Sequence, residues 1–90
     1  MNENELKEIE HIRFILSELQ RHMCRLYGNN SVAMDIDTNG WRHCVHIVVW
    51  TEYKPYETDC TTLPERFMLA PWHSYDENEK VWADIMMLLP

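Results

Sequence analysis

Residues 31–52 constrain the fold more than any other part of the chain, because they read as two strands joined by a tight turn. Asn39-Gly40 separates two runs in which apolar and polar residues alternate. Asn-Gly suits a type I′ turn, whose two central residues both need positive φ. A two-residue loop fixes the register, so we expect Ile36 to face His43. The segment predicts an antiparallel β-hairpin.

The same register assigns side chains to two faces. The apolar face should carry Val32, Met34, Ile36, Trp41, His43, Val45, Ile47 and Val49. The polar face should carry Asp35, Asp37, Arg42, Cys44 and His46. Asp37 would lie opposite Arg42, and unlike charges across two strands are mildly favourable. An isolated hairpin is only marginally stable, so we expect a third strand or a helix to cover it.

Residues 3–27 are predicted to form one long helix. Its apolar residues recur at alternating spacings of three and four, namely Ile9, Ile12, Leu16, Leu19, Met23 and Leu26. Asn2 or Asn4 can cap the start, and Gly28 is placed to end the helix. This stripe has two interpretations. It can pack on the hairpin within one chain, or it can form a coiled-coil seam between two copies through Ile9, Ile12, Leu16, Leu19 and Met23.

The last third of the chain predicts one further element and a second helix. Residues 63–70 can form a short helix with Pro64 at its first position, or a third strand with Phe67 and Leu69 facing inward, which the pattern favours. Ser74 and Glu77 have capping-box spacing and open a C-terminal helix. We therefore expect a single α+β domain over residues 1–90. It combines a long N-terminal helix, an antiparallel hairpin extended to a three-stranded sheet, and a C-terminal helix packed on that sheet.

The formal net charge of −7 restricts the partners of the protein. Residues 51–90 hold eight acidic residues against three basic ones. This excess argues against direct binding to nucleic acid or anionic lipid, because phosphate contacts need lysine and arginine. It is compatible with a basic protein partner, and also with an ordinary well-solvated surface.

The chain offers few signs of targeting or of catalysis. Its acidic, polar start does not resemble a signal peptide, and the longest apolar run, Ile85–Leu89, is too short to span a membrane. Three cysteines without a scaffold spacing favour reduced thiols and a cytoplasmic location. There is no glycine-rich phosphate loop, nucleophile elbow or zinc-protease motif. We therefore expect no enzymatic activity, no cofactor and no membrane association.

Asp35, Cys44 and His46 are the residues whose side chains could together bind a metal ion. The predicted register puts Asp35 opposite Cys44, with His46 on the same face, so that oxygen, sulfur and nitrogen donors would converge. A fourth ligand would have to come from elsewhere, and no paired Cys or His motif accompanies these residues. We expect no bound metal, and a metal-binding domain that uses Asp35, Cys44 and His46 stays the third hypothesis.

Aromatic and acidic residues are interleaved in the second half of the chain, which suits a surface that binds arginine or lysine. The candidate partner-binding residues are Trp50, Tyr53, Tyr56, Glu57, Asp59, Trp72, Tyr75, Asp76, Glu77 and Glu79. The alternative, which carries equal weight, is that several of these rings belong to the core and the acids are merely solvated.

In size, acidity and helix–hairpin–helix order the chain resembles small phage-encoded inhibitors of bacterial defence systems, such as anti-CRISPR proteins. That resemblance implies a non-enzymatic protein that occludes a basic, nucleic-acid-binding surface of its partner. The first alternative is a homodimeric accessory or structural subunit paired through the N-terminal helix.

Overall fold

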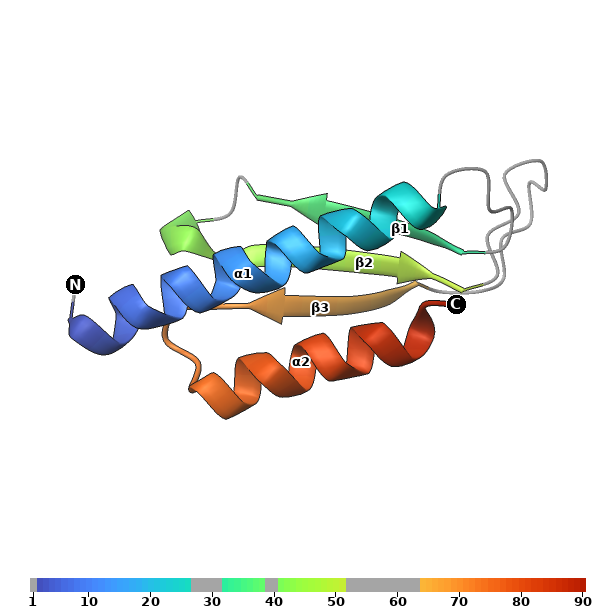
Figure 1. Cartoon of the computed structure of the whole chain (residues 1–90). Coiled ribbons are helices and arrows are strands. Elements are labelled where there is room, and N and C mark those ends of the chain that lie inside the picture. Colours follow the sequence, from blue (N-terminus) through green and yellow to red (C-terminus); the bar gives the residue numbers. More distant parts are fainter. Residues whose placement is uncertain (1, 27–31, 39–40, 52–63) are drawn as a thin grey trace.

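The computed structural model describes residues 2–26, 32–38, 41–51 and 64–90. In these ranges the chain forms α1 (Glu3–Leu26), β1 (Ala33–Asp37), a short 3₁₀ turn η1 (Trp41–His43), β2 (Val45–Trp50), β3 (Glu65–Leu69) and α2 (Tyr75–Leu88). The predicted α+β fold is confirmed, including the third strand at residues 65–69 (Figure 1). Neither helix in the described part of the chain is long and apolar enough to cross a membrane.

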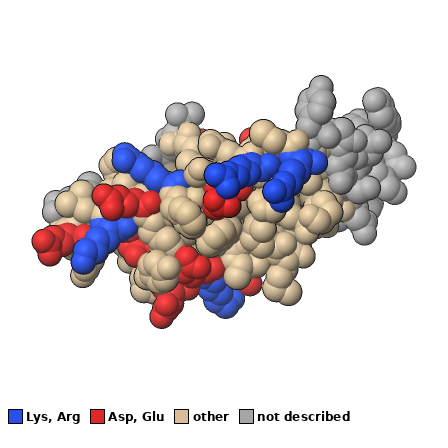
Figure 2. Space-filling view, viewed as in Figure 1, with Lys and Arg blue, Asp and Glu red and all other residues tan. Residues whose placement is uncertain are grey.

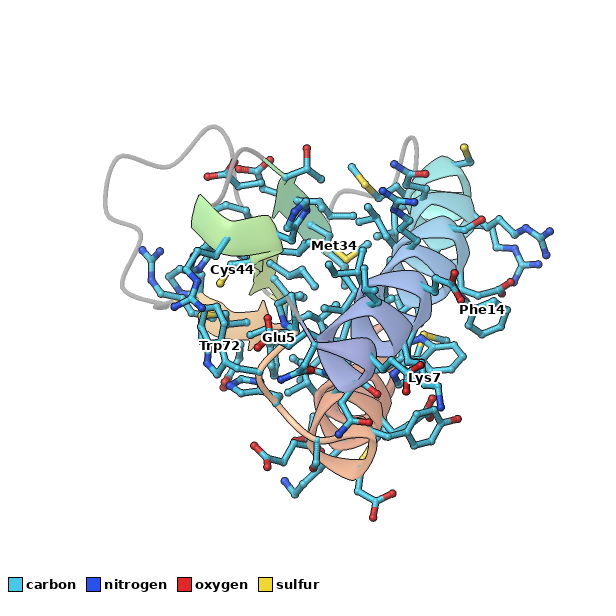
Figure 3. The ribbon with its side chains drawn as sticks, turned by 90° about the vertical axis from the view of Figure 1, so that its left-hand side faces the viewer. Glu5, Lys7, Phe14, Met34, Cys44 and Trp72 are labelled. Atoms are coloured by element: carbon cyan, nitrogen blue, oxygen red, sulfur yellow. The ribbon has the colours of Figure 1, made fainter. Side chains whose placement is uncertain are left out.

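The strands form one antiparallel sheet in the order β1-β2-β3, and both helices pack on the same face of it (Figures 1 and 3). The core between the two layers takes residues from both α-helices and all three strands of the described chain, namely Ile12, Ile15, Leu19, Met34, Val45, Ile47, Val49, Leu69 and Ile85. The helices run parallel to one another, so both begin at the same end of the molecule (Figure 1). This shared end is where the candidate functional site lies.

The predicted hairpin forms, but the predicted register is wrong. Ile36 faces Ile47 rather than His43, and Asp37 faces His46 rather than Arg42. The reversal takes residues 38–44 instead of two, and Asn39 and Gly40 themselves lie outside the described residues. Arg42 and His43 belong to η1, where both are exposed.

The two faces survive this correction because the observed register differs from the predicted one by four residues, and side chains alternate with a period of two. Met34, Val45, Ile47 and Val49 are buried as expected, and Ile36 is half-buried. The longer reversal sets Ile36 against Ile47 and Met34 against Val49, so that apolar residues face each other in the middle of the sheet. Cys44, predicted on the polar face, precedes β2 and is buried.

Local signals define the beginning of α1 as predicted. The backbone N–H of Glu5 donates to Oδ1 of Asn2 over 2.8 Å, and the N–H of Leu6 donates to the carbonyl of Asn2. Asn2 is therefore the N-cap. The predicted C-terminal cap, Gly28, lies outside the described residues.

The buried stripe of α1 is shifted from the predicted one. Ile9, Ile12 and Leu19 are buried, but Ile15 takes the central place expected for Leu16, and Met23 is exposed. Figure 3 shows Met34 of β1 between the sheet and α1, with Phe14 pointing outward. Ile12 and Leu19 thus pack in the core of a single chain, which favours the intramolecular interpretation of the stripe.

The capping box of α2 forms as predicted. Ser74 accepts a hydrogen bond from the backbone N–H of Glu77 and donates one to the Glu77 carboxylate. On the sheet side, Ile85 is fully buried, and Val81, Trp82, Met86, Leu88 and Leu89 pack partly buried around the core. Leu69 of β3 is buried and Phe67 packs against the core, so both face inward as the strand interpretation required.

Candidate functional site

The β3–α2 turn, residues 70–74, joins the sheet to α2 at the end where α1 also begins. The fully buried amide of Asn78 fixes this turn. Its Oδ1 accepts from the N–H of Ala70 over 3.2 Å, and its Nδ2 donates to the carbonyl of Ala70 over 3.0 Å. The same Nδ2 donates to the carboxylate of Glu8 over 2.9 Å. One side chain of α2 therefore holds the end of β3 and the second turn of α1 together.

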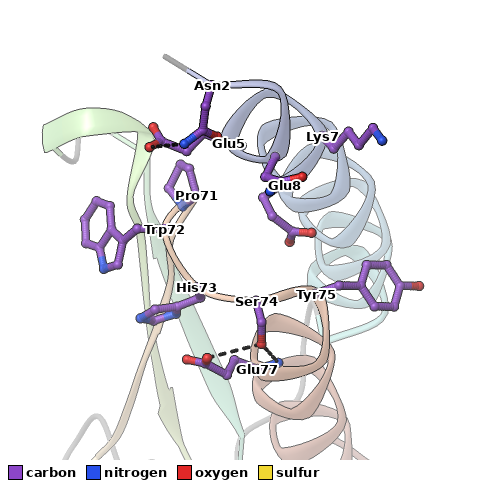
Figure 4. Close-up of a pocket in the computed structure, with 11 residues that line it drawn as sticks. Asn2, Glu5, Lys7, Glu8, Pro71, Trp72, His73, Ser74, Tyr75 and Glu77 are labelled. Carbon is purple, nitrogen blue, oxygen red and sulfur yellow. Dashed lines mark hydrogen bonds between the residues drawn. The ribbon is translucent and has the colours of Figure 1, made fainter.

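A hollow of about 590 Å³ opens between the start of α1 and this turn (Figure 4). Its lining combines carboxylates with aromatic rings, including Glu5, Glu8, Trp72, Tyr75 and Glu77. Trp72 and Tyr75 lie on opposite sides of the opening, and each is about half exposed, at 46% and 56%. Exposed rings of this size beside carboxylates are suited to contact with a cationic side chain.

The described residues include an example of such a contact. The guanidinium of Arg42, on η1, lies 5.5 Å from the centre of the Trp72 ring, within the range of a cation–π interaction. One face of the Trp72 ring thus already accommodates an arginine of the same chain.

A partly buried cluster of His11, Glu8 and Glu79 joins the two helices next to the hollow. Nδ1 of His11 lies 3.0 Å from Oε2 of Glu8, and Nε2 lies 2.6 Å from Oε1 of Glu79. Glu8 is only 8% exposed. The Tyr75 ring stacks on the His11 ring with centroids 4.1 Å apart and planes 15° apart.

Burial lowers the pKa of His11, but the hydrogen bonds and the negative charges of Glu8 and Glu79 outweigh burial and raise it above the usual 6.5. The negative charge of Glu79 is the main cause that raises the pKa of Tyr75 above 10.0. The cluster therefore favours a protonated His11 beside a neutral Tyr75.

The acids are concentrated where the helices begin. Residues 3–12 of α1 and 75–80 of α2 hold seven acidic residues, Glu3, Glu5, Glu8, Glu10, Asp76, Glu77 and Glu79, against Lys7 and Lys80. Figure 2 shows basic side chains over the later turns of α1, and the sequence places Arg21 and Arg25 there. We call the surface formed by Glu5, Trp72, Tyr75, Asp76, Glu77 and Glu79 the acidic end.

The structure brings together half of the predicted partner-binding residues. Trp72, Tyr75 and Glu77 line the hollow, and Asp76 and Glu79 lie beside them in the first two turns of α2. Trp50 does not join them, because it lies at the far end of β2, opposite Ala33, and is half-buried. Tyr53, Tyr56, Glu57 and Asp59 lie outside the described residues.

The alternative ligand cluster is not assembled. Asp35 lies opposite Val48 rather than Cys44, and Cys44 is buried while His46 faces Asp37. Burial is the main cause that raises the pKa of the Cys44 thiol, and the nearby charge of Arg42 offsets it in part. Within the described ranges, no three His, Cys, Asp or Glu side chains are grouped so that they could hold a metal ion.

Sequence reasoning missed the roles of Glu8, His11 and Asn78. The contact between Glu8 and His11 could have been predicted from their spacing, since residues three apart on a helix are neighbours. Their partners Asn78 and Glu79 lie about 70 positions further along the chain, and only the packing of α2 beside α1 brings them close.

Comparisons of the chain with protein-family models, with curated proteins and with solved structures found no match. The functional interpretation therefore depends on the geometry of the acidic end.

Proposed function

We propose that this protein is a non-enzymatic binding module that covers a basic surface of a protein partner with its acidic end. The observation that carries the proposal is the pair of exposed rings, Trp72 and Tyr75, on either side of a hollow lined by carboxylates. Acids in the first turn stabilise a helix by themselves, because they offset its dipole. Helix stability does not explain two large aromatic side chains exposed at the same place.

The chemistry of this surface selects its partner. Aromatic anchors beside carboxylates match arginine-rich or lysine-rich surfaces through charge pairs and cation–π contacts. Proteins that bind nucleic acid present such surfaces to phosphate groups. The proposal therefore includes occlusion of a nucleic-acid-binding site, in the manner of phage-encoded inhibitors of bacterial defence.

A capture experiment with matched charge changes tests this function. The bait proteins are the wild type, Asp76→Lys at the acidic end and Asp84→Lys further along α2. Both variants change the net charge equally, so they separate a local effect from a general one. We expect a partner that the wild type and Asp84→Lys retain at low salt, that Asp76→Lys loses, and that nucleic acid displaces. Equal capture by the two variants, or indifference to nucleic acid, would contradict the proposal.

A further inference from the structure

The contacts of His11 require a particular protonation state. Its two ring nitrogens each face a carboxylate oxygen, at 3.0 Å from Glu8 and 2.6 Å from Glu79. A neutral imidazole has one N–H and one lone pair, so it can donate to only one of them. Both contacts are hydrogen bonds to carboxylates only when the ring carries two protons and a positive charge. The side chain of His11 is 9% exposed, so water has little access to its ring nitrogens, although the Glu79 side chain is 33% exposed.

We propose that His11 is a pH-operated latch between the helices: the doubly protonated ring holds Glu8 of α1 and Glu79 of α2 together, and loss of its proton weakens the hold on Glu79 and on the stacked Tyr75. The titratable groups that face the ring are Glu8 from its own helix and Glu79 and Tyr75 from α2. Loss of the proton turns one hydrogen bond into a contact between a lone pair and a carboxylate. If the lone pair faces Glu8, the buried Glu8 carboxylate loses the hydrogen bond from His11 and retains the one from Asn78.

The direction of the pH dependence follows from the raised pKa of His11. A group whose pKa is higher in the folded state stabilises that state fully below its unfolded pKa of about 6.5. This stabilisation is lost as the pH rises through the folded-state pKa. Tyr75 stays neutral over this range because its own pKa is raised above 10.0, chiefly by Glu79. The latch is therefore closed in mild acid and opens on the alkaline side.

The latch also regulates the acidic end, and this part of the inference rests on the proposed function. Tyr75 stacks on His11 and Glu79 binds it, so two residues of the acidic end owe their positions to the protonated ring. Opening removes the positive charge of His11 and so makes the net charge more negative by one, which favours approach to a basic surface. It also releases Tyr75 and Glu79 from fixed positions, so bound partner should dissociate faster at higher pH.

NMR titration of the full-length protein tests the latch without any partner. Long-range ¹H–¹⁵N spectra report the protonation of each ring nitrogen. We expect His11 to be doubly protonated at pH 6 and to titrate above 6.5. Glu79→Gln keeps an acceptor but removes the charge, so it should lower the pKa of His11, while Asp76→Asn removes one charge from the same turn and should change it less. A neutral His11 at pH 6, or equal effects of the two variants, would overturn the latch.

Thermal unfolding gives a second readout. The Tm of the wild type should fall further between pH 6 and pH 9 than the Tm of His11→Gln, because only the wild type loses the latch in that interval. His22→Gln removes another histidine of α1 and should keep the wild-type pH dependence. If His11→Gln does not fold, Glu79→Gln replaces it in this comparison. Parallel pH profiles for wild type and variant would overturn the latch.

Binding of an arginine-rich peptide at pH 6.0 and 8.5 tests the regulation, since arginine keeps its charge throughout. We expect faster dissociation at pH 8.5 for the wild type and a smaller change for Glu79→Gln. A confirmed latch with pH-independent dissociation would overturn the regulation alone. Absence of binding to the peptide at pH 6.0 would instead contradict the proposed function and leave the latch standing.

Discussion

Arg42 and His43 have φ angles of 57° and 64°, in the left-handed region that non-glycine residues enter at a cost. They lie next to each other in η1, where the chain reverses between β1 and β2. The cation–π contact between Arg42 and the Trp72 ring offsets part of this cost. His43 is exposed, and its side chain is therefore the better one to replace.

We expect His43→Gly to stabilise the protein by about 0.5–1 kcal/mol, because glycine adopts positive φ without the steric cost of Cβ. Chemical denaturation measures this change. His43→Ala is the matched control, since it removes the same imidazole but keeps Cβ and should bring no such gain. Equal stabilisation by the two variants would point to the imidazole rather than to the backbone.

Asn78 is the buried polar residue on which the β3–α2 turn depends, through both polar groups of Ala70 and the carboxylate of Glu8. Asn78→Ala should destabilise the fold by about 2–3 kcal/mol, because buried groups lose their hydrogen bonds. Asn4→Ala changes an exposed asparagine near the same end and should cost far less. A loss below about 1 kcal/mol for Asn78→Ala, measured by denaturation, would show that water replaces these bonds.

Substitutions in α1 can test whether its apolar stripe packs within one chain or between two chains. Leu19 is fully buried in the core, whereas Met23, one turn later on the same stripe, is exposed. Leu19→Glu should unfold the protein, because a buried unpaired charge is costly. Met23→Glu should leave it folded. Circular dichroism with light scattering separates these results from a seam between chains, for which Leu19→Glu would give a folded monomer.

The helices were predictable because their signals are local. Asn2 and Ser74 cap their helices by accepting hydrogen bonds from the N–H groups three positions later. The apolar spacing of α1 gave its buried face only approximately, because Ile15 is buried in place of Leu16 and Met23 is exposed. The strand register was not, because a turn motif at Asn39-Gly40 does not determine how many residues the reversal takes. The pairing of Ile36 with Ile47 brings apolar side chains of two strands together, and a turn motif carries no information on that preference.

The site could be predicted only in part, for a similar reason. The exposure of Trp72 and Tyr75 follows from a turn and the first residue of a helix, which the sequence indicates. The contacts of His11 with Glu79 and of Asn78 with Glu8 depend on α1 and α2 lying parallel. Periodicity gives the buried face of each helix but not which helices become neighbours.

Over the whole chain, acidic residues outnumber basic ones where the helices begin, whereas Arg21 and Arg25 lie in the last turns of α1. Association with a basic partner should therefore slow as salt rises, since long-range attraction is screened. Asp76→Lys should slow association more than Asp84→Lys does, although the two have the same net charge. Association that is insensitive to salt and to both reversals, measured by stopped flow, would exclude electrostatic steering.

Dissociation depends on the rings instead. Trp72→Ala should speed it by an amount equivalent to about 2 kcal/mol if Trp72 is a central anchor. Phe14→Ala is the control, because Phe14 is exposed to a similar degree, at 54%, but packs against Trp82 away from the hollow. If Phe14→Ala had the larger effect, the partner would bind along the helices and not at the acidic end.

The parallel course of the helices also determines how the protein should be handled on a sensor surface. Because α2 starts at the acidic end, its last turn and the C-terminus lie at the other end of the long axis (Figure 1). Tethering through the C-terminus would hold the hollow away from the support, toward the solution. Tethering through the N-terminus would place the support beside Glu5 and Trp72. The two orientations of the same molecule should therefore give different apparent affinities for a basic partner on a sensor chip.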